Sequence, residues 1–130
     1  MPISTNGTPR HRILAVDDQD VILRLIERSL DKGSYHLLTS TSGQQALGLI
    51  EAAGQRIDLL ITDLSLPDVQ GLSLIQHLLR HQPDSQWMVL SGWHIDRARA
   101  TLGGIFEERR FLAKPFTISA LQQRVLDLLS

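Results

Sequence analysis

The 130-residue sequence contains no cysteine, and its charges of opposite sign nearly balance. The lack of cysteine excludes disulfides, thiolate metal sites and cysteine nucleophiles. With 13 basic and 14 acidic side chains, the formal net charge is −1. Nucleic-acid-binding domains usually carry a basic excess, and segments that bind anionic membranes carry polybasic runs. We therefore expect neither a nucleic acid nor a membrane to be a direct partner.

Long apolar runs are absent as well. None approaches the ~20 residues of a membrane span, and the N-terminus lacks the apolar core of a secretion signal. We expect a cytoplasmic protein. Residues 1–11 are rich in small polar residues without periodicity, which predicts a flexible N-terminal leader. The remaining residues, 12–130, are predicted to form one domain.

Short apolar runs alternate with segments of helical periodicity along the whole domain. The runs predict five strands, at residues 13–16, 35–39, 59–61, 87–90 and 111–113, each followed by a helix. Val21 is assigned to the buried stripe of the first helix, and Leu72, Ile75 and Leu79 to that of the third. Strict alternation predicts an α/β fold with a mainly parallel sheet that helices cover on both faces.

Polar side chains follow four of the five predicted strands. They are the pair Asp17 and Asp18, then Asp63, Ser91 and Lys114. Because the carboxyl ends of parallel strands meet at one edge of a sheet, we expect these side chains to converge there. Three neighbouring carboxylates repel one another unless a cation lies between them.

A magnesium ion fits this set, because Mg²⁺ prefers oxygen ligands and keeps several waters. Asp18 and Asp63 suit direct coordination, Asp17 a contact through water, and the backbone carbonyl of Ser65 a further ligand. With its charge screened, Asp63 could act as a nucleophile and form an aspartyl phosphate. Lys114 and Ser91 would then contact the phosphoryl oxygens.

The order and spacing of these residues resemble the receiver (CheY-like) domain of two-component response regulators, over nearly the whole chain after residue 11. The residues that carry the resemblance are Asp17-Asp18, Asp63 with Pro67 and Gly71, Ser91, and Lys114-Pro115-Phe116. The resemblance implies a flavodoxin-like three-layer sandwich, with a five-stranded parallel sheet of order 2-1-3-4-5 and five helices. It also implies Mg²⁺-dependent phosphoryl transfer to Asp63, from a phosphohistidine of a sensor kinase or of a histidine phosphotransfer protein.

The resemblance further implies a conformational switch. Phosphorylation would draw Ser91 inward and let Phe111 rotate inward, which would reshape the face formed by the fourth helix, fifth strand and fifth helix. A downstream protein or a second copy of the chain would bind this face. Ser91 replaces a frequent threonine of the family, and Gly92 replaces a frequent alanine and should loosen its loop. The runs around Ser91 and Lys114 are similar to those of receivers attached to hybrid sensor kinases.

Trp93 lies two residues beyond Ser91, where the family has a side chain that borders the phosphorylation site. We expect Trp93 to shield the acyl phosphate from water and lengthen its lifetime. The alternative is that this tryptophan packs on its own loop.

The last helix is followed by a single serine. The chain is therefore either a receiver that acts alone or a piece of a longer protein.

Two weaker patterns are similar to motifs of other functions, but each has a simpler explanation. His77 and His81 have the four-residue spacing of zinc sites, but without an evident third ligand we predict a solvated helix surface. The run Ser40-Thr-Ser-Gly43 is faintly similar to the phosphate loop of flavodoxins, but its position after the second strand favours a helix cap.

Two further protein classes share part of the pattern. A haloacid-dehalogenase-like phosphatase would also use an aspartate nucleophile, but it needs a second aspartate where this chain has Ser65. An interaction module with a vestigial site would not need the complete acid set with Lys114. We therefore expect a signalling switch and not a turnover enzyme.

Overall fold

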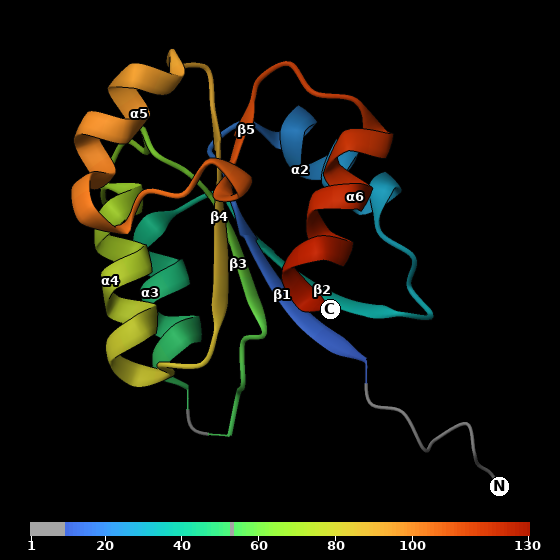
Figure 1. The fold of residues 1–130 in the computed structure, drawn as a ribbon. Coiled ribbons are helices and arrows are strands. Elements are labelled where there is room, and N and C mark those ends of the chain that lie inside the picture. Colours follow the sequence, from blue (N-terminus) through green and yellow to red (C-terminus); the bar gives the residue numbers. More distant parts are fainter. Residues whose placement is uncertain (1–9, 53) are drawn as a thin grey trace, which may run out of the picture.

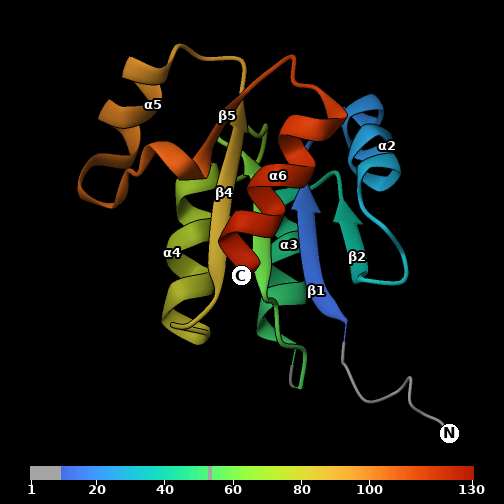
Figure 2. The ribbon, with the colours of Figure 1, turned by 45° about the vertical axis from the view of Figure 1, so that its right-hand side comes forward.

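A computed structural model describes residues 10–52 and 54–130. Its core is a parallel sheet with the strand order β2-β1-β3-β4-β5 (Figures 1 and 2). The strands are β1 (His11–Val16), β2 (Tyr35–Ser40), β3 (Leu59–Asp63), β4 (Gln86–Ser91) and β5 (Phe111–Ala113). This order confirms the fold that the resemblance implies. The predicted leader falls mostly outside the described residues, so its boundary stays a prediction, and β1 begins at His11.

Helices cover both faces of the sheet and make the fold a three-layer sandwich. They are α2 (Asp20–Ser29), α3 (Gly43–Glu51), α4 (Gly71–His81), α5 (Ile95–Leu102) and α6 (Ile118–Leu129). Figure 1 shows α3, α4 and α5 on one side of the sheet, with α2 and α6 on the other. Two 3₁₀ turns, Gly103–Ile105 and Glu108–Arg110, connect α5 to β5. Within the described ranges, no helix has both the length and the apolar character needed to cross a membrane.

The sheet separates two hydrophobic cores because successive strand residues point to opposite faces. Leu14 and Val16 of β1 enter the core under α3, α4 and α5. Ile13 and Ala15 of the same strand enter the core under α2 and α6. A strand buried on both sides needs apolar residues at every position. This requirement explains the unbroken apolar runs of the sequence.

The structure corrects two predicted helix faces. Val21 was assigned to the buried stripe of the first helix, but it is 62% exposed and Leu23 is buried instead. In α4 the buried side chains are Leu74, Ile75 and Leu78, while Leu72 and Leu79 are partly buried. Apolar residues adjoin the predicted buried positions in both helices. Spacing alone therefore does not decide which of two neighbouring residues faces the core. Packing against the sheet decides it.

Candidate functional site

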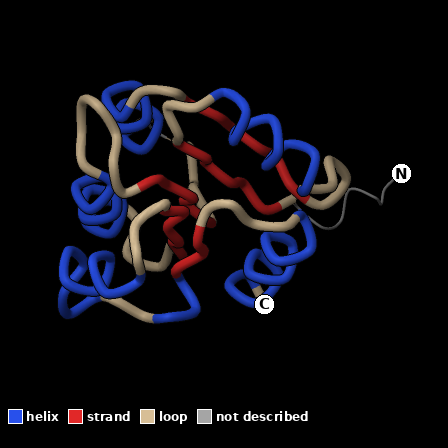
Figure 3. Tube along the Cα trace, turned by 90° about the horizontal axis from the view of Figure 1, so that it is seen from above, coloured by secondary structure: helices blue, strands red, loops and turns tan. Residues whose placement is uncertain are grey.

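The carboxyl ends of the strands meet at one edge of the sheet, as the parallel topology requires. Figure 3 looks down on this edge. Asp17 follows β1 directly, Asp63 is the last residue of β3, and Ser91 is the last residue of β4. Lys114 follows β5, and its backbone N–H donates a hydrogen bond to the Ser91 carbonyl oxygen at 2.8 Å. The four predicted strand ends therefore meet, although they lie far apart in the sequence.

Asp17, Asp18 and Asp63 form an acidic cluster at this edge. Each offers a carboxylate oxygen, and these oxygens lie within 4.8 Å of one another. Asp17 is fully buried, Asp63 is buried, and Asp18 is exposed. The cluster therefore extends from the protein interior to the solvent. It opens on the side where a hydrated ion can approach.

Lys114 neutralises part of the charge of this cluster. Its Nζ donates to Asp17 Oδ2 at 2.6 Å and to Asp63 Oδ2 at 3.0 Å. The other oxygen of Asp17 accepts from the backbone N–H of Gln19 at 2.9 Å. The other oxygen of Asp63 accepts from the N–H of Ser65 at 3.1 Å. Lys114 thus fixes the separation of the two buried carboxylates.

The pKa values of Asp17 and Lys114 record this crowding. Burial raises the pKa of Asp17 above its ordinary value, against hydrogen bonds from Lys114 and Gln19 that lower it. Burial lowers the pKa of Lys114, but its bonds to Asp17 and Asp63 outweigh burial, so this pKa lies above its ordinary value. Lys114 is therefore charged at neutral pH. A cation that joined the cluster would relieve the remaining repulsion between the carboxylates.

The donor set of the cluster fits a hard divalent cation. Three carboxylates supply only oxygen ligands, which Mg²⁺ and Ca²⁺ prefer. Both oxygens of Asp17 already accept hydrogen bonds, whereas Asp18 is exposed to solvent. The residues present thus fit the metal that the sequence predicts.

The loop at residues 64–70, which follows Asp63, returns to the end of β3. A Cβ atom added at Gly71 would lie 2.3 Å from the Asp63 carbonyl oxygen and 2.9 Å from Leu64 Cα, so only glycine fits. Asp68 in the same loop bonds to the start of α3. Sequence reasoning missed Asp68, because its partners lie 24 to 26 residues earlier in the chain.

The loop that follows Ser91 contains the other predicted functional side chains. Ser91 is buried, and its Oγ accepts a hydrogen bond from the Trp93 N–H at 2.9 Å. Trp93 is half-buried, and the Arg97 guanidinium lies 3.8 Å from its ring centroid. Phe111 is 8% exposed and belongs to the core beneath α5. Its rotation on phosphorylation stays a prediction.

Two of the weaker sequence patterns now have structural explanations. Ser42 Oγ accepts from the Gln45 N–H at 3.2 Å, which confirms the helix cap. The prediction of a solvated surface is wrong for His77, whose side chain is 17% exposed. His77 Nε2 lies 2.8 Å from Glu51 Oε2, because α4 packs beside α3.

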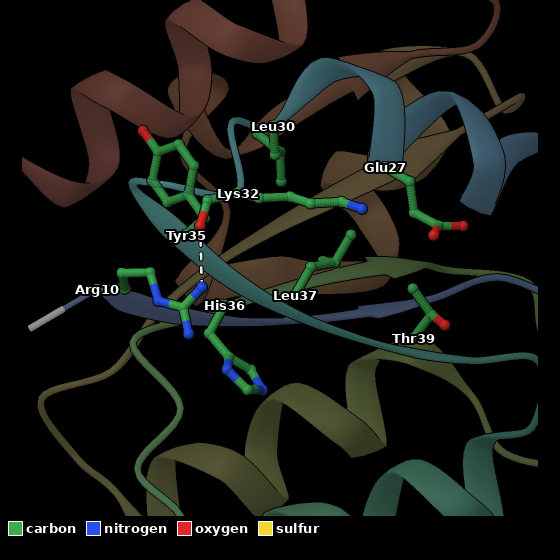
Figure 4. A pocket seen from close by; sticks show the side chains of 8 residues that line it. All are labelled: Arg10, Glu27, Leu30, Lys32, Tyr35, His36, Leu37 and Thr39. Carbon is green, nitrogen blue, oxygen red and sulfur yellow. Dashed lines mark hydrogen bonds between the residues drawn. The ribbon is translucent and has the colours of Figure 1, made fainter.

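A pocket of about 290 Å³ lies against β2 (Figure 4). Leu30, Tyr35 and Leu37 contribute to its lining, and Arg10 donates a hydrogen bond to the Lys32 carbonyl oxygen at 2.9 Å beside it. None of the three clustered carboxylates lines this pocket. The acidic cluster is the candidate functional site because the strand ends meet there and its oxygen ligands fit a cation.

Comparisons with known proteins agree with this geometry. The family model described as "Response regulator receiver domain" matches residues 13–126. The sensor kinase CckA of Brucella abortus is 28% identical over 117 residues, which are 90% of this chain and 12% of CckA. The chain therefore spans only a small part of that relative.

Solved structures show the same likeness. A response regulator receiver protein from Sinorhizobium medicae superposes with a TM-score of 0.79 at 25% identity, covering 92% of this chain and 94% of the other. A response regulator protein from Burkholderia pseudomallei, with a phosphorylated aspartic acid and a calcium ion, gives a TM-score of 0.70 at 27% identity. That superposition covers 92% of this chain and 66% of the other.

Proposed function

Because the chain belongs to the response regulator receiver domain family, we propose that Asp63 is the phosphoacceptor of a two-component phosphorelay. The observation that carries the proposal is the position of Asp63, which shares the acidic cluster with Asp17 and Asp18 and a hydrogen bond with Lys114. The phosphorylated aspartic acid of the Burkholderia pseudomallei protein supports it. A receiver domain is a signalling domain and not a turnover enzyme.

The proposed reaction is transfer of a phosphoryl group from a phosphohistidine to Asp63. A carboxylate oxygen of Asp63 bonds to phosphorus while the phosphorus–nitrogen bond of the donor breaks, and the electron pair stays on the imidazole nitrogen. The donor is a sensor histidine kinase or a histidine phosphotransfer protein. Such transfers depend on positioning and on stabilising the charge of the equatorial oxygens. Lys114 Nζ, 3.0 Å from Asp63 Oδ2, provides positive charge at that place.

Mg²⁺, when bound, would offset the negative charges of the carboxylates and of the incoming phosphoryl group. We assign direct coordination to Asp18, Asp63 and the Ser65 carbonyl, and a contact through water to Asp17. The complete burial of Asp17 favours this indirect role, whereas Asp18 is exposed to solvent.

Ser91 and Phe111 are the proposed switch residues. The Ser91 hydroxyl, which accepts from Trp93 N–H, would turn to donate to a phosphoryl oxygen, and Phe111 would repack. The face of α5, β5 and α6 would change with them. An open groove of about 510 Å³ between Ile95, Phe111 and Arg124 supports this face as the docking site for a downstream protein or a second copy of the chain.

Trp93 is proposed to prolong the phosphorylated state by covering the acyl phosphate. Its half-buried ring at the same sheet edge supports this role. The stacking of Arg97 supports the alternative, in which the ring packs on its own loop.

We also propose a cytoplasmic location. With a net charge of −1, direct binding to a nucleic acid or membrane is not part of the proposal.

The test compares the wild type with Asp63→Asn in the presence of Mg²⁺ and acetyl phosphate. We expect the wild type to gain the mass of one phosphoryl group, and beryllofluoride to change its tryptophan fluorescence. Asp63→Asn should show neither response. Asp84→Asn, which removes an exposed acid between α4 and β4, is the matched control and should behave like the wild type. A phosphoryl gain that survives in Asp63→Asn would overturn the assignment.

A further inference from the structure

The carboxylate of Asp68 binds the first turn of α3 from a distant part of the chain. Its Oδ1 accepts from the Gly43 N–H at 3.0 Å and from the Val69 N–H at 2.9 Å. Its Oδ2 accepts from the Gln44 N–H at 3.0 Å and from the Ser42 hydroxyl at 3.0 Å. All four bonds converge on one exposed side chain in the middle of the loop at residues 64–70.

These contacts stabilise the charged form of Asp68. The first N–H groups of a helix have no partner within the helix, and the aligned peptide dipoles place partial positive charge there. The hydrogen bond from Gln44 is the main cause that lowers the pKa of Asp68 to about 2. Asp68 is therefore ionised at neutral pH.

The helix does not need Asp68 as its cap. Ser42 already occupies the N-cap position of α3, and its side chain accepts from the Gln45 N–H. The bonds of Asp68 are additional to this local cap. Their effect therefore falls on the loop at residues 64–70, which they fasten to α3.

Tight packing reinforces the attachment. A Cβ atom at Gly43 would lie 2.7 Å from Val69 Cβ and 3.0 Å from Asp68 Oδ1, so the loop lies directly against the start of the helix. The two ends of the loop are joined by the Gly71 N–H, which donates to the Leu64 carbonyl oxygen at 3.2 Å. The loop is thus closed at its ends and attached to α3 at Asp68.

We propose that Asp68 is a positioning residue that holds the loop after Asp63 against α3 and so places the Ser65 carbonyl for metal binding. This inference rests on the proposed function, because it concerns the same metal site. Ser65 lies between the two attachments, and its own N–H already donates to Asp63 Oδ1. A ligand carbonyl must be held close to its productive position for a metal to bind well.

The test measures Mg²⁺ affinity by tryptophan fluorescence in two variants that loosen the loop in different ways. Asp68→Asn replaces one acceptor oxygen by an NH2 group, which cannot accept the hydrogen bonds of the N–H donors that it faces. Gly43→Ala leaves Asp68 intact but pushes Val69 away from the helix. We expect each to weaken Mg²⁺ binding about tenfold, at the low end of the range for residues that support metal ligands.

Each variant has a matched control on the same protein. Asp84→Asn removes an exposed acid that is remote from the loop at residues 64–70. Gly48→Ala adds a methyl group to α3 where no atom lies within 4 Å. Both controls should retain wild-type affinity. Amide exchange at Gly43 and Gln44 gives a metal-independent readout, and it should be faster in Asp68→Asn than in Asp84→Asn.

Unchanged Mg²⁺ affinity in Asp68→Asn would overturn the positioning role, whatever Gly43→Ala does. This failure is distinct from failure of the proposed function, which shows as phosphorylation of Asp63→Asn. If Asp63→Asn is inert and Asp68→Asn binds Mg²⁺ normally, Asp63 remains the phosphoacceptor and Asp68 has only a structural role. Weaker Mg²⁺ binding in both loop variants, with both controls unchanged, supports the proposal.

Discussion

Two loops at the carboxyl edge of the sheet differ in how firmly they are held. The loop after Asp63 leaves no room for a side chain at Gly71, and Asp68 bonds it to α3. The loop after Ser91 contains Gly92, and a Cβ atom added there would have no neighbour within 4 Å. The proposed function uses both properties. In it, the fixed loop would present the phosphoacceptor and a metal ligand, and the open loop would leave room for the Ser91 hydroxyl to move.

Lys114 links the two loops. Its side chain bonds to Asp63, and its backbone N–H bonds to the Ser91 carbonyl oxygen. A change of charge at Asp63 therefore acts directly on a residue attached to the β4 end. We infer that phosphorylation displaces the loop after Ser91 because this loop resists less.

Alanine substitutions at Gly71 and Gly92 should give the largest difference between the two loops. In Gly71→Ala the new methyl group meets backbone atoms of Asp63 and Leu64, which cannot rotate away. We expect a loss of about 3 kcal/mol in the free energy of unfolding, the upper part of the usual range for overpacking. Gly92→Ala should stay within about 0.5 kcal/mol of the wild type, as surface substitutions do. Urea unfolding of both variants measures the difference, and equal losses would contradict it.

Trp93→Ala tests the role of the open loop. If the ring covers the acyl phosphate, its removal admits water and shortens the phosphorylated lifetime severalfold, with little change in the free energy of unfolding. Decay of the phosphorylated species after removal of acetyl phosphate is the measurement. Arg97→Ala removes the stacked guanidinium but leaves the ring, and it serves as the control. A lifetime that Trp93→Ala leaves unchanged favours a tryptophan that only packs on α5.

Local patterns predicted the strand ends but not the contacts that hold them. Asp17 and Asp63 each follow an apolar run, and a parallel sheet brings such ends together, so the acidic cluster could be predicted from the sequence. The exposure of Val21 could not be predicted, because the next two residues, Ile22 and Leu23, are also apolar. Spacing alone does not decide which of the three faces the core. The pairing of His77 with Glu51 depends on the packing of α3 against α4. Periodicity within either helix says nothing about that contact.

The attachment of the fixed loop to α3 through Asp68 should weaken slightly at acidic pH. The pKa of Asp68 is lowered from its ordinary value of 3.8 to about 2 in the folded protein. A lowered folded pKa means that the unfolded chain binds the proton more tightly. The stabilising contribution of Asp68 is therefore present above about pH 4, and it is lost as the pH falls toward 2.

Asp68→Asn removes this titration, so it should melt at a lower temperature than the wild type above about pH 4, by a margin that narrows on acidification. Melting temperatures at several pH values between 2 and 7 would measure the margin. Asp84→Asn provides the baseline for removing an exposed acid. A margin that is constant across this range would show that the charge of Asp68 does not hold the loop, and that the packing of Gly43 against Val69 holds it instead.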